Sequence, residues 1–154
     1  MNILFVHQNM PGQYRELVQW LAEQGEHRIY FLTQRKNPAK IAGVETRIYA
    51  PHHGPKKEAY GLSKVWEEAS GAGFGAALAC QKIEAEEGFK PDLVVGHVGW
   101  GELTFLKQVW PDVPIIGFFE YYYRLFGGPV NFDEEEPVNV HTPFLLQARN
   151  TVPA

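Results

Sequence analysis

Cysteine is almost missing from this sequence, since Cys80 is the single one among 154 residues. One thiol cannot form an internal disulfide, and this fits the reducing cytoplasm, where we expect the protein to reside. Long apolar runs are missing too, so no stretch is predicted to span a bilayer. The first apolar run begins at Ile3 without a basic leader, unlike a signal peptide. Peripheral contact with a membrane surface stays compatible with this composition.

A surplus of positive charge is also missing. The formal net charge is −4 with histidine neutral, which disfavours a nucleic-acid partner. The sequence has neither a Walker loop nor a Gly-x-Ser-x-Gly turn, two marks of well-known enzyme classes. His52 and His53 lie in a basic loop without acidic or cysteine partners at metal spacing, and Asp133 to Glu136 fits a solvated acidic turn. We therefore expect no metal and no cofactor.

What the sequence does contain is an alternation of apolar runs and amphipathic stretches. The apolar runs predict strands, and apolar residues at helical spacing predict helices. The expected strands are 3–6, 28–33, 46–49, 93–96 and 115–119, and the expected helices are 13–24, 61–87, 102–109 and 143–150. This order predicts one α/β domain over residues 1–154, Rossmann-like and doubly wound, with helices on both faces of a mainly parallel sheet. We expect the strand order 3-2-1-4-5.

Three glycines, Gly71, Gly73 and Gly75, imitate a dinucleotide-binding fingerprint. They lie inside the long helical pattern and follow no strand, so we reject that interpretation. Close packing of this helix on the sheet explains them better. Cys80 lies on the apolar stripe of the same helix, and we expect it to be a packing residue.

Polar residues follow three of the expected strands, at the positions where the strands end. In an open parallel sheet, ligands bind beyond the carboxyl ends of the strands at the switch point, here between the first and fourth strands. Gly12 precedes the first helix, whose N-terminus can hold an anion such as a phosphate. The residues placed around this crevice are His7, Gln8, Asn9, Gly12 and Gln13 after the first strand, His97, Trp100 and Glu102 after the fourth, and Glu120, Tyr123 and Arg124 after the fifth.

The sequence leaves the roles of these residues open. His97 can serve as a general base, a hydroxyl ligand or a charge stabiliser, or be a histidine satisfied by the backbone. His7 is closer to the core, where a packing role is the simpler interpretation. Glu120 can bind hydroxyls, take a proton or pair with Arg124. Trp100 can stack on a sugar ring or pack against its neighbours.

Three blocks of the sequence together resemble a known family. Residues 3–13 (ILFVHQNMPGQ) closely resemble the opening of a bacterial subgroup of glycosyltransferase family four. Residues 91–97 (PDLVVGH) with 99–102 (GWGE), and residues 120–124 (EYYYR), resemble later parts of the same subgroup. The resemblance covers nearly the whole chain, about Met1 to Asn150, and the three blocks are specific in combination.

The resemblance implies the GT-B architecture, in which two Rossmann-like domains face each other across a cleft. The N-terminal domain mainly binds the acceptor and the C-terminal domain binds the nucleotide-sugar donor. Transfer usually retains the anomeric configuration and needs no metal. This chain would be the acceptor-side domain without its donor domain, either a truncated piece or a natural half, and inactive alone. Many family members have a histidine at the end of the fifth strand, whereas this chain has Glu120 there.

From this resemblance and from their positions, we expect His97 and Glu120 to be catalytic. The residues expected to contact the nucleotide sugar and an unknown acceptor are Gln8, Asn9, Gly12, Gln13, Trp100, Glu102, Tyr123 and Arg124. The alternative function is a non-catalytic module that binds a nucleotide or a sugar in the same crevice. Without its donor domain, the chain is also expected to form homodimers through Trp100 and the aromatic residues of 121–126.

Overall fold

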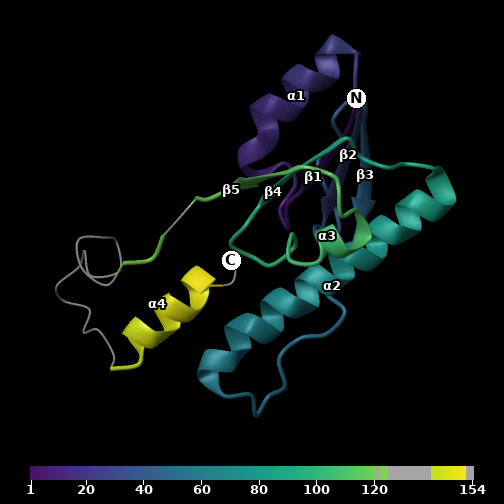
Figure 1. Cartoon of the computed structure of the whole chain (residues 1–154). Helices are drawn as coiled ribbons and strands as arrows, with labels where there is room; N and C mark the ends of the chain where they lie inside the picture. The colour runs from purple at the N-terminus through teal and green to yellow at the C-terminus, as the bar shows by residue number, and fades with distance from the viewer. Residues whose placement is uncertain (121, 125–139, 152–154) are drawn as a thin grey trace.

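The computed structural model describes residues 1–120, 122–124 and 140–151 (Figure 1). Its elements are β1 (Asn2–Val6), the 3-10 turn η1 (Gly12–Tyr14), α1 (Arg15–Gln24), β2 (Arg28–Thr33), β3 (Val44–Ile48), α2 (Gly61–Glu87), β4 (Leu93–His97), α3 (Leu106–Val109), β5 (Ile115–Phe118) and α4 (Thr142–Thr151). The predicted acidic turn at 133–136 lies outside the described residues, as do Tyr121 and residues 125 and 126 of the expected dimer contact.

The five strands form one parallel sheet in the order β3-β2-β1-β4-β5, which confirms the predicted order. β1 lies in the middle, between β2 and β4. Its residues alternate between two core clusters, with Leu4 and Val6 in one and Ile3 and Phe5 in the other. Both faces of the strand are therefore covered, and this is why its sequence is continuously apolar.

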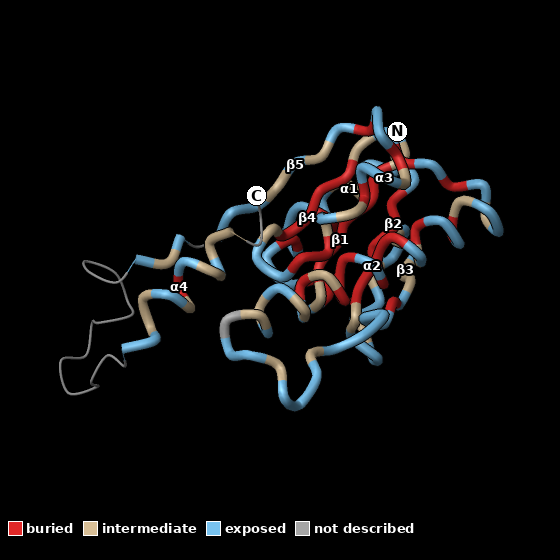
Figure 2. The backbone as a smooth tube through the Cα atoms, turned by 60° about the horizontal axis from the view of Figure 1, so that its bottom comes forward, coloured by how far each residue is buried: buried red, intermediate tan, exposed pale blue. Residues whose placement is uncertain are grey.

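Helices cover both faces of the sheet, as predicted (Figure 1). Tyr14 and Val18 of the η1–α1 segment belong to the core on one face. Cys80 of α2 and Leu106 of α3 belong to the core on the other face, and the burial of Cys80 confirms its packing role. Figure 2 shows buried backbone concentrated in β1, β2 and β4, whereas α4 is mostly intermediate or exposed. No helix in the described part of the chain is long and apolar enough to cross a membrane.

Two predicted elements need correction, whereas the bounds of the others agree or shift by one or two residues. The third strand is Val44–Ile48 instead of 46–49, because Val44 already pairs with Ile29 of β2. The helix predicted over 102–109 is wrong in its first half, since only Leu106–Val109 is helical. The chain turns first, and the N–H of Thr104 donates to the carbonyl of Gly101 over 3.0 Å. Apolar spacing alone does not distinguish such a series of turns from a helix.

Three of the glycines of α2, Gly71, Gly73 and Gly75, pack on loops and not on the strands, which corrects the expected packing partner. A Cβ on Gly75 would lie 2.1 Å from the carbonyl oxygen of Ala50, and one on Gly71 would lie 2.0 Å from that of His53. On Gly73 it would meet the carbonyl oxygen of Gly101 at 2.5 Å. The glycines thus let α2 approach the loops that follow β3 and β4, and this positions the β4 loop beside the crevice.

We expect Gly75→Ala to lower the free energy of unfolding by about 2 kcal/mol, because the new methyl group meets backbone that cannot move aside cheaply. The matched control is Gly61→Ala in the same helix, where a Cβ has no neighbour within 4 Å. Urea denaturation followed by circular dichroism measures both variants. Equal stability of Gly75→Ala and the wild type would contradict this close packing.

Candidate functional site

The carboxyl edge of the sheet brings together residues from three strand ends. The Nε2 atom of His97, at the end of β4, lies 3.0 Å from the Oε2 atom of Glu120, which follows β5. The ring of His7, which follows β1, meets the ring of His97 edge-on with 5.3 Å between centroids. The predicted convergence of these strand ends at the switch point between β1 and β4 is confirmed in position.

The hydrogen bonds of His97 define its tautomer. The backbone N–H of Gly99 donates to Nδ1 of His97 over 3.0 Å, so Nδ1 must be the unprotonated nitrogen. Nε2 therefore carries the proton and donates a hydrogen bond to the carboxylate of Glu120. In this state neither ring nitrogen has a free lone pair. The imidazole orients the carboxylate and is not itself available as a base.

Glu120 is the accessible member of the pair. Its side chain is 45% exposed, whereas that of His97 is 5% exposed. A hydrogen bond from the Gln13 amide lowers the pKa of Glu120 most, and the hydrogen bond from His97 lowers it further. The carboxylate is therefore ionised at neutral pH. The sequence offered Arg124 as the pairing partner of Glu120, but the carboxylate pairs with His97 instead, and the side chain of Arg124 is exposed.

His7 has a larger part in the site than the sequence indicated. It is only 4% exposed, as expected of a packing residue. Its Nδ1 atom accepts a hydrogen bond from the N–H of Asn9 over 2.9 Å. Burial, followed by the neighbouring His97, lowers the pKa of His7, so its ring stays neutral behind the charged carboxylate. The signal in the sequence was its position at the strand end beside His97 in the predicted order.

The loop between β1 and α1 forms the wall next to this pair. Gly12 has φ +51°, and a Cβ there would lie 3.0 Å from the ring of His7, so both the backbone and the neighbouring ring favour glycine. The buried hydroxyl of Thr33 donates to the carbonyl of Gln8 over 2.8 Å and ties the loop to the end of β2. Asn9 and Gln13 are exposed on the loop, and Gln8 is half-buried.

Glu102 lies beneath this loop and not on the crevice surface, where the sequence placed it as a ligand contact. Its side chain is fully buried, and neither carboxylate oxygen makes a well-formed hydrogen bond to a described residue. Its polar neighbours are the hydroxyl of Tyr49 and the N–H of Gln8. Burial raises the pKa of Glu102 to about 7. The residue supports the loop from below.

Glu102 makes stability depend on pH in a defined direction. Its pKa is about 7 in the folded state against 4.5 as a free group, so the folded state binds the proton more tightly between these values. The free energy of unfolding therefore falls as the pH rises through this window, by roughly 3 kcal/mol when the carboxyl is fully ionised. We expect Glu102→Gln to remove this loss, so that the stability of the variant relative to the wild type rises as the pH goes from about 4.5 to about 7 and stays constant above that window.

Urea denaturation at a series of pH values measures this effect. Glu23→Gln is the control, because Glu23 is exposed at the end of α1. A Glu102→Gln variant whose stability follows the wild-type pH dependence would show that this carboxyl is ionised at little cost in the folded protein.

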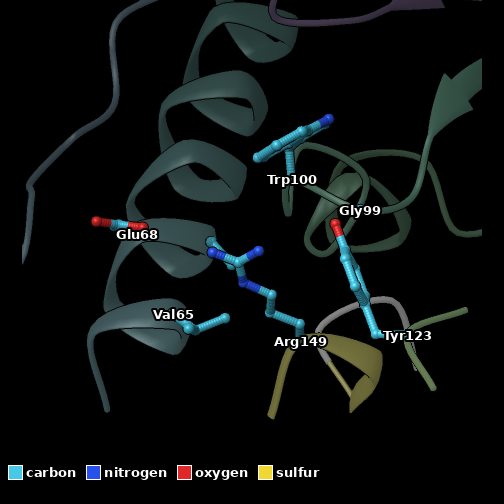
Figure 3. A pocket seen from close by; sticks show the side chains of 7 residues that line it. Val65, Glu68, Gly99, Trp100, Tyr123 and Arg149 are labelled. Carbon is cyan, nitrogen blue, oxygen red and sulfur yellow. The ribbon is translucent and has the colours of Figure 1, made fainter. Parts of the chain in front are cut away.

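The remaining predicted residues lie at two places. Trp100 is 46% exposed with its ring 6.2 Å from that of His97, and Tyr123 lies with it around a small hollow (Figure 3). Arg124 is exposed and does not line this hollow. Glu68 and Arg149 also line it, and nothing in the sequence singled them out. Both come from exposed helical positions, and no local pattern distinguishes them from ordinary surface charges.

Within residues 1–120, 122–124 and 140–151, no three His, Cys, Asp or Glu side chains are placed to hold a metal ion. Arg35 is a basic side chain beside the β1 loop, and it donates to the carbonyl of Met10 over 3.3 Å. The groups described at this edge of the sheet are thus a carboxylate, two imidazoles, amides, aromatic rings and the guanidinium of Arg35.

Comparison with known proteins identifies the family. A model of the glycosyl transferase family 4 group matches residues 25–154. The match includes the second and third sequence blocks, with His97 and Glu120, and begins after the first block at residues 3–13. No curated protein matches the chain significantly. The match extends over most of the chain and includes β2 to α4, so the chain belongs to the glycosyl transferase family 4 group.

Proposed function

We propose that this chain is the acceptor-side domain of a retaining glycosyltransferase of GT-B architecture. The full-length protein would move a sugar from a nucleotide-sugar donor to an acceptor hydroxyl. The observation that carries this proposal is the Glu120 carboxylate, which is half-exposed at the switch point and held by His97. Membership of a glycosyl transferase family agrees with a site that has a hydroxyl-binding group.

In this proposal, Glu120 accepts a hydrogen bond from the acceptor hydroxyl and aims the hydroxyl oxygen at the donor. The hydroxyl oxygen forms a bond to the anomeric carbon, while the bond from this carbon to the diphosphate breaks and its electron pair leaves with the diphosphate. The hydroxyl proton passes to Glu120 along their hydrogen bond, and Glu120 then releases it to solvent or to the departing diphosphate. His97 is then a positioning residue, because it touches Glu120 and not the reacting atoms.

The loop between β1 and α1 supplies further contacts in this proposal. Asn9 and Gln13 offer amides that donate and accept hydrogen bonds, and both are exposed beside the crevice. Gly12 leaves room for the donor diphosphate as it approaches from the second domain. That domain would contribute the nucleotide pocket, and no metal takes part. Arg124 is exposed after β5, and in this proposal its guanidinium binds the phosphate groups of the donor.

The rival function is a binding module that holds a nucleotide on this domain alone. Isothermal titration of this chain with UDP, GDP and ADP separates the two. The acceptor-side proposal expects no saturable binding in the micromolar range, because the site presents a carboxylate and few cations. Micromolar binding of a free nucleotide, lost in Gly12→Val, would favour the module instead.

A further inference from the structure

Beside the His97–Glu120 pair lies a hollow of about 80 Å³ that the proposed reaction does not use (Figure 3). We call it the Trp100 hollow. Its lining comes from α2, from the loop after β4, from the segment after β5 and from α4, and consists of Val65, Glu68 and Ala69, Gly99 and Trp100, Tyr123, and Arg149. Gly99 also donates to His97, so the hollow and the carboxylate lie on two sides of one imidazole.

The α4 wall of the Trp100 hollow is formed in advance by a pair of hydrogen bonds. The side chain of Asn150 accepts from the N–H of Tyr123 and donates to its carbonyl, both over 2.8 Å. The guanidinium of Arg149 lies 5.5 Å from the centre of the Tyr123 ring, a cation–π distance. α4 in turn packs against α2. A ligand therefore meets positioned side chains and does not have to order them.

Two small residues keep the hollow open. Ala69 is buried at its base, and Gly99 carries no side chain that could fill it. A Cβ on Gly99 would lie 2.9 Å from Cε1 of His97. Any larger residue at this position would press on the imidazole that holds Glu120. The shape of the hollow and the position of the carboxylate are thus linked through His97.

The chemistry of the lining selects a class of ligand. Trp100 presents an exposed apolar ring, whereas Glu68 offers acceptors and Arg149 offers donors. Within the described residues, Arg149 has no carboxylate at ion-pair distance, so its donors are not committed to a salt bridge. The negative charge of Glu68 and the positive charge of Arg149 balance, so the hollow favours an uncharged ligand over an anion or a cation. A ring with apolar C–H faces and several hydroxyls matches all of these groups.

We propose that the Trp100 hollow binds one uncharged sugar ring of the acceptor, stacked on Trp100 and held through its hydroxyls by Glu68 and Arg149. The hollow, at about 80 Å³, is smaller than a whole pyranose, so one edge of a single ring enters it while the rest of the ring lies against Trp100. This inference rests on the proposed function, because it assigns the ring to the acceptor. It adds that the acceptor is a glycoside and that its recognition depends on residues outside the His97–Glu120 pair.

The test is an NMR titration of this ¹⁵N-labelled chain with methyl glycosides of glucose, galactose and mannose, and with glucuronic acid as the anionic counterpart. At least one neutral glycoside should shift the indole N–H of Trp100 and the amide of Gly99, with a saturable Kd in the millimolar range. Trp100→Ala should weaken binding at least about tenfold, a loss of about 1.4 kcal/mol. Trp20→Ala is the matched control, since Trp20 is exposed on α1.

Two outcomes overturn the inference, namely no shift with any neutral glycoside, or binding that survives in Trp100→Ala. Tighter binding of glucuronic acid would contradict the proposal that the ligand is an uncharged sugar.

Transfer assays of the full-length protein separate this inference from the proposed function. Unchanged acceptor KM in Trp100→Ala, with transfer intact, removes the subsite and leaves the function. Glycoside binding at Trp100 by a full-length protein that transfers nothing removes the function.

Discussion

Purified as an isolated chain, this domain is expected to transfer sugar at least about 10⁵-fold more slowly than the full-length protein. A two-domain cleft holds donor and acceptor in reactive geometry, and such positioning supplies roughly 7–11 kcal/mol of the barrier reduction. Among the described residues, this site offers a group for one hydroxyl, and the hollow beside it has a volume of only about 80 Å³. The departing diphosphate also needs positive groups aimed at it.

The measurement is an assay with labelled nucleotide sugars and candidate acceptors, run on both proteins at equal concentration. Adding the isolated donor domain to the isolated chain is the control for damage during purification, since reassembly should restore part of the rate. Transfer by the chain alone within about tenfold of the full-length rate, a difference of 1.4 kcal/mol, would contradict the division of labour proposed here.

Glu120→Gln in the full-length protein is expected to lower kcat/KM for transfer by about 10- to 150-fold. The reason is the loss of a hydrogen bond to an ionised acceptor, which contributes about 1.5–3 kcal/mol. The side chain is half-exposed, so the thermal stability should change little. Glu23→Gln, an exposed carboxylate far from the crevice, is the matched control and should keep wild-type kinetics.

His97→Asn separates positioning from catalysis at the same site. We expect a smaller loss than for Glu120→Gln. We also expect the acid limb of the pH–rate profile to move to higher pH, because His97 is one of the groups that hold the pKa of Glu120 down. Loss of activity without that movement would indicate a structural role for His97 only. Wild-type kinetics in Glu120→Gln would remove the carboxylate from the reaction.

Most of the fold was predictable because short sequence patterns determine most of its strands and helices. The strands at 28–33 and 93–96 are short apolar runs, and the helix at 61–87 has an apolar stripe that ends before Gly88. The order of the strands follows from the right-handed crossover of β–α–β units. The turns at 102–105 were predicted to be helical because their apolar residues have helical spacing.

The positions of the site residues were predictable only where the order of the strands determines them. The juxtaposition of His97 and Glu120 follows from neighbouring strand ends, and it was expected. The burial of Glu102 was not, because it depends on Tyr49 and the β1 loop, which are distant in the sequence. The same holds for Arg149, whose place beside Trp100 requires α4 to return to α2. The direction of these side chains depends on tertiary contacts, and residue spacing in the sequence does not determine it.

The most direct test of the central claim is the transfer reaction of the full-length protein, with the anomeric configuration of the product read from its NMR coupling constants. Donors are a panel of nucleotide sugars, and acceptors are a panel of glycosides. The account predicts transfer to a hydroxyl with the configuration of the donor retained, and strong loss of the same product in Glu120→Gln. A product of inverted configuration, or no transfer from any nucleotide sugar, would contradict it.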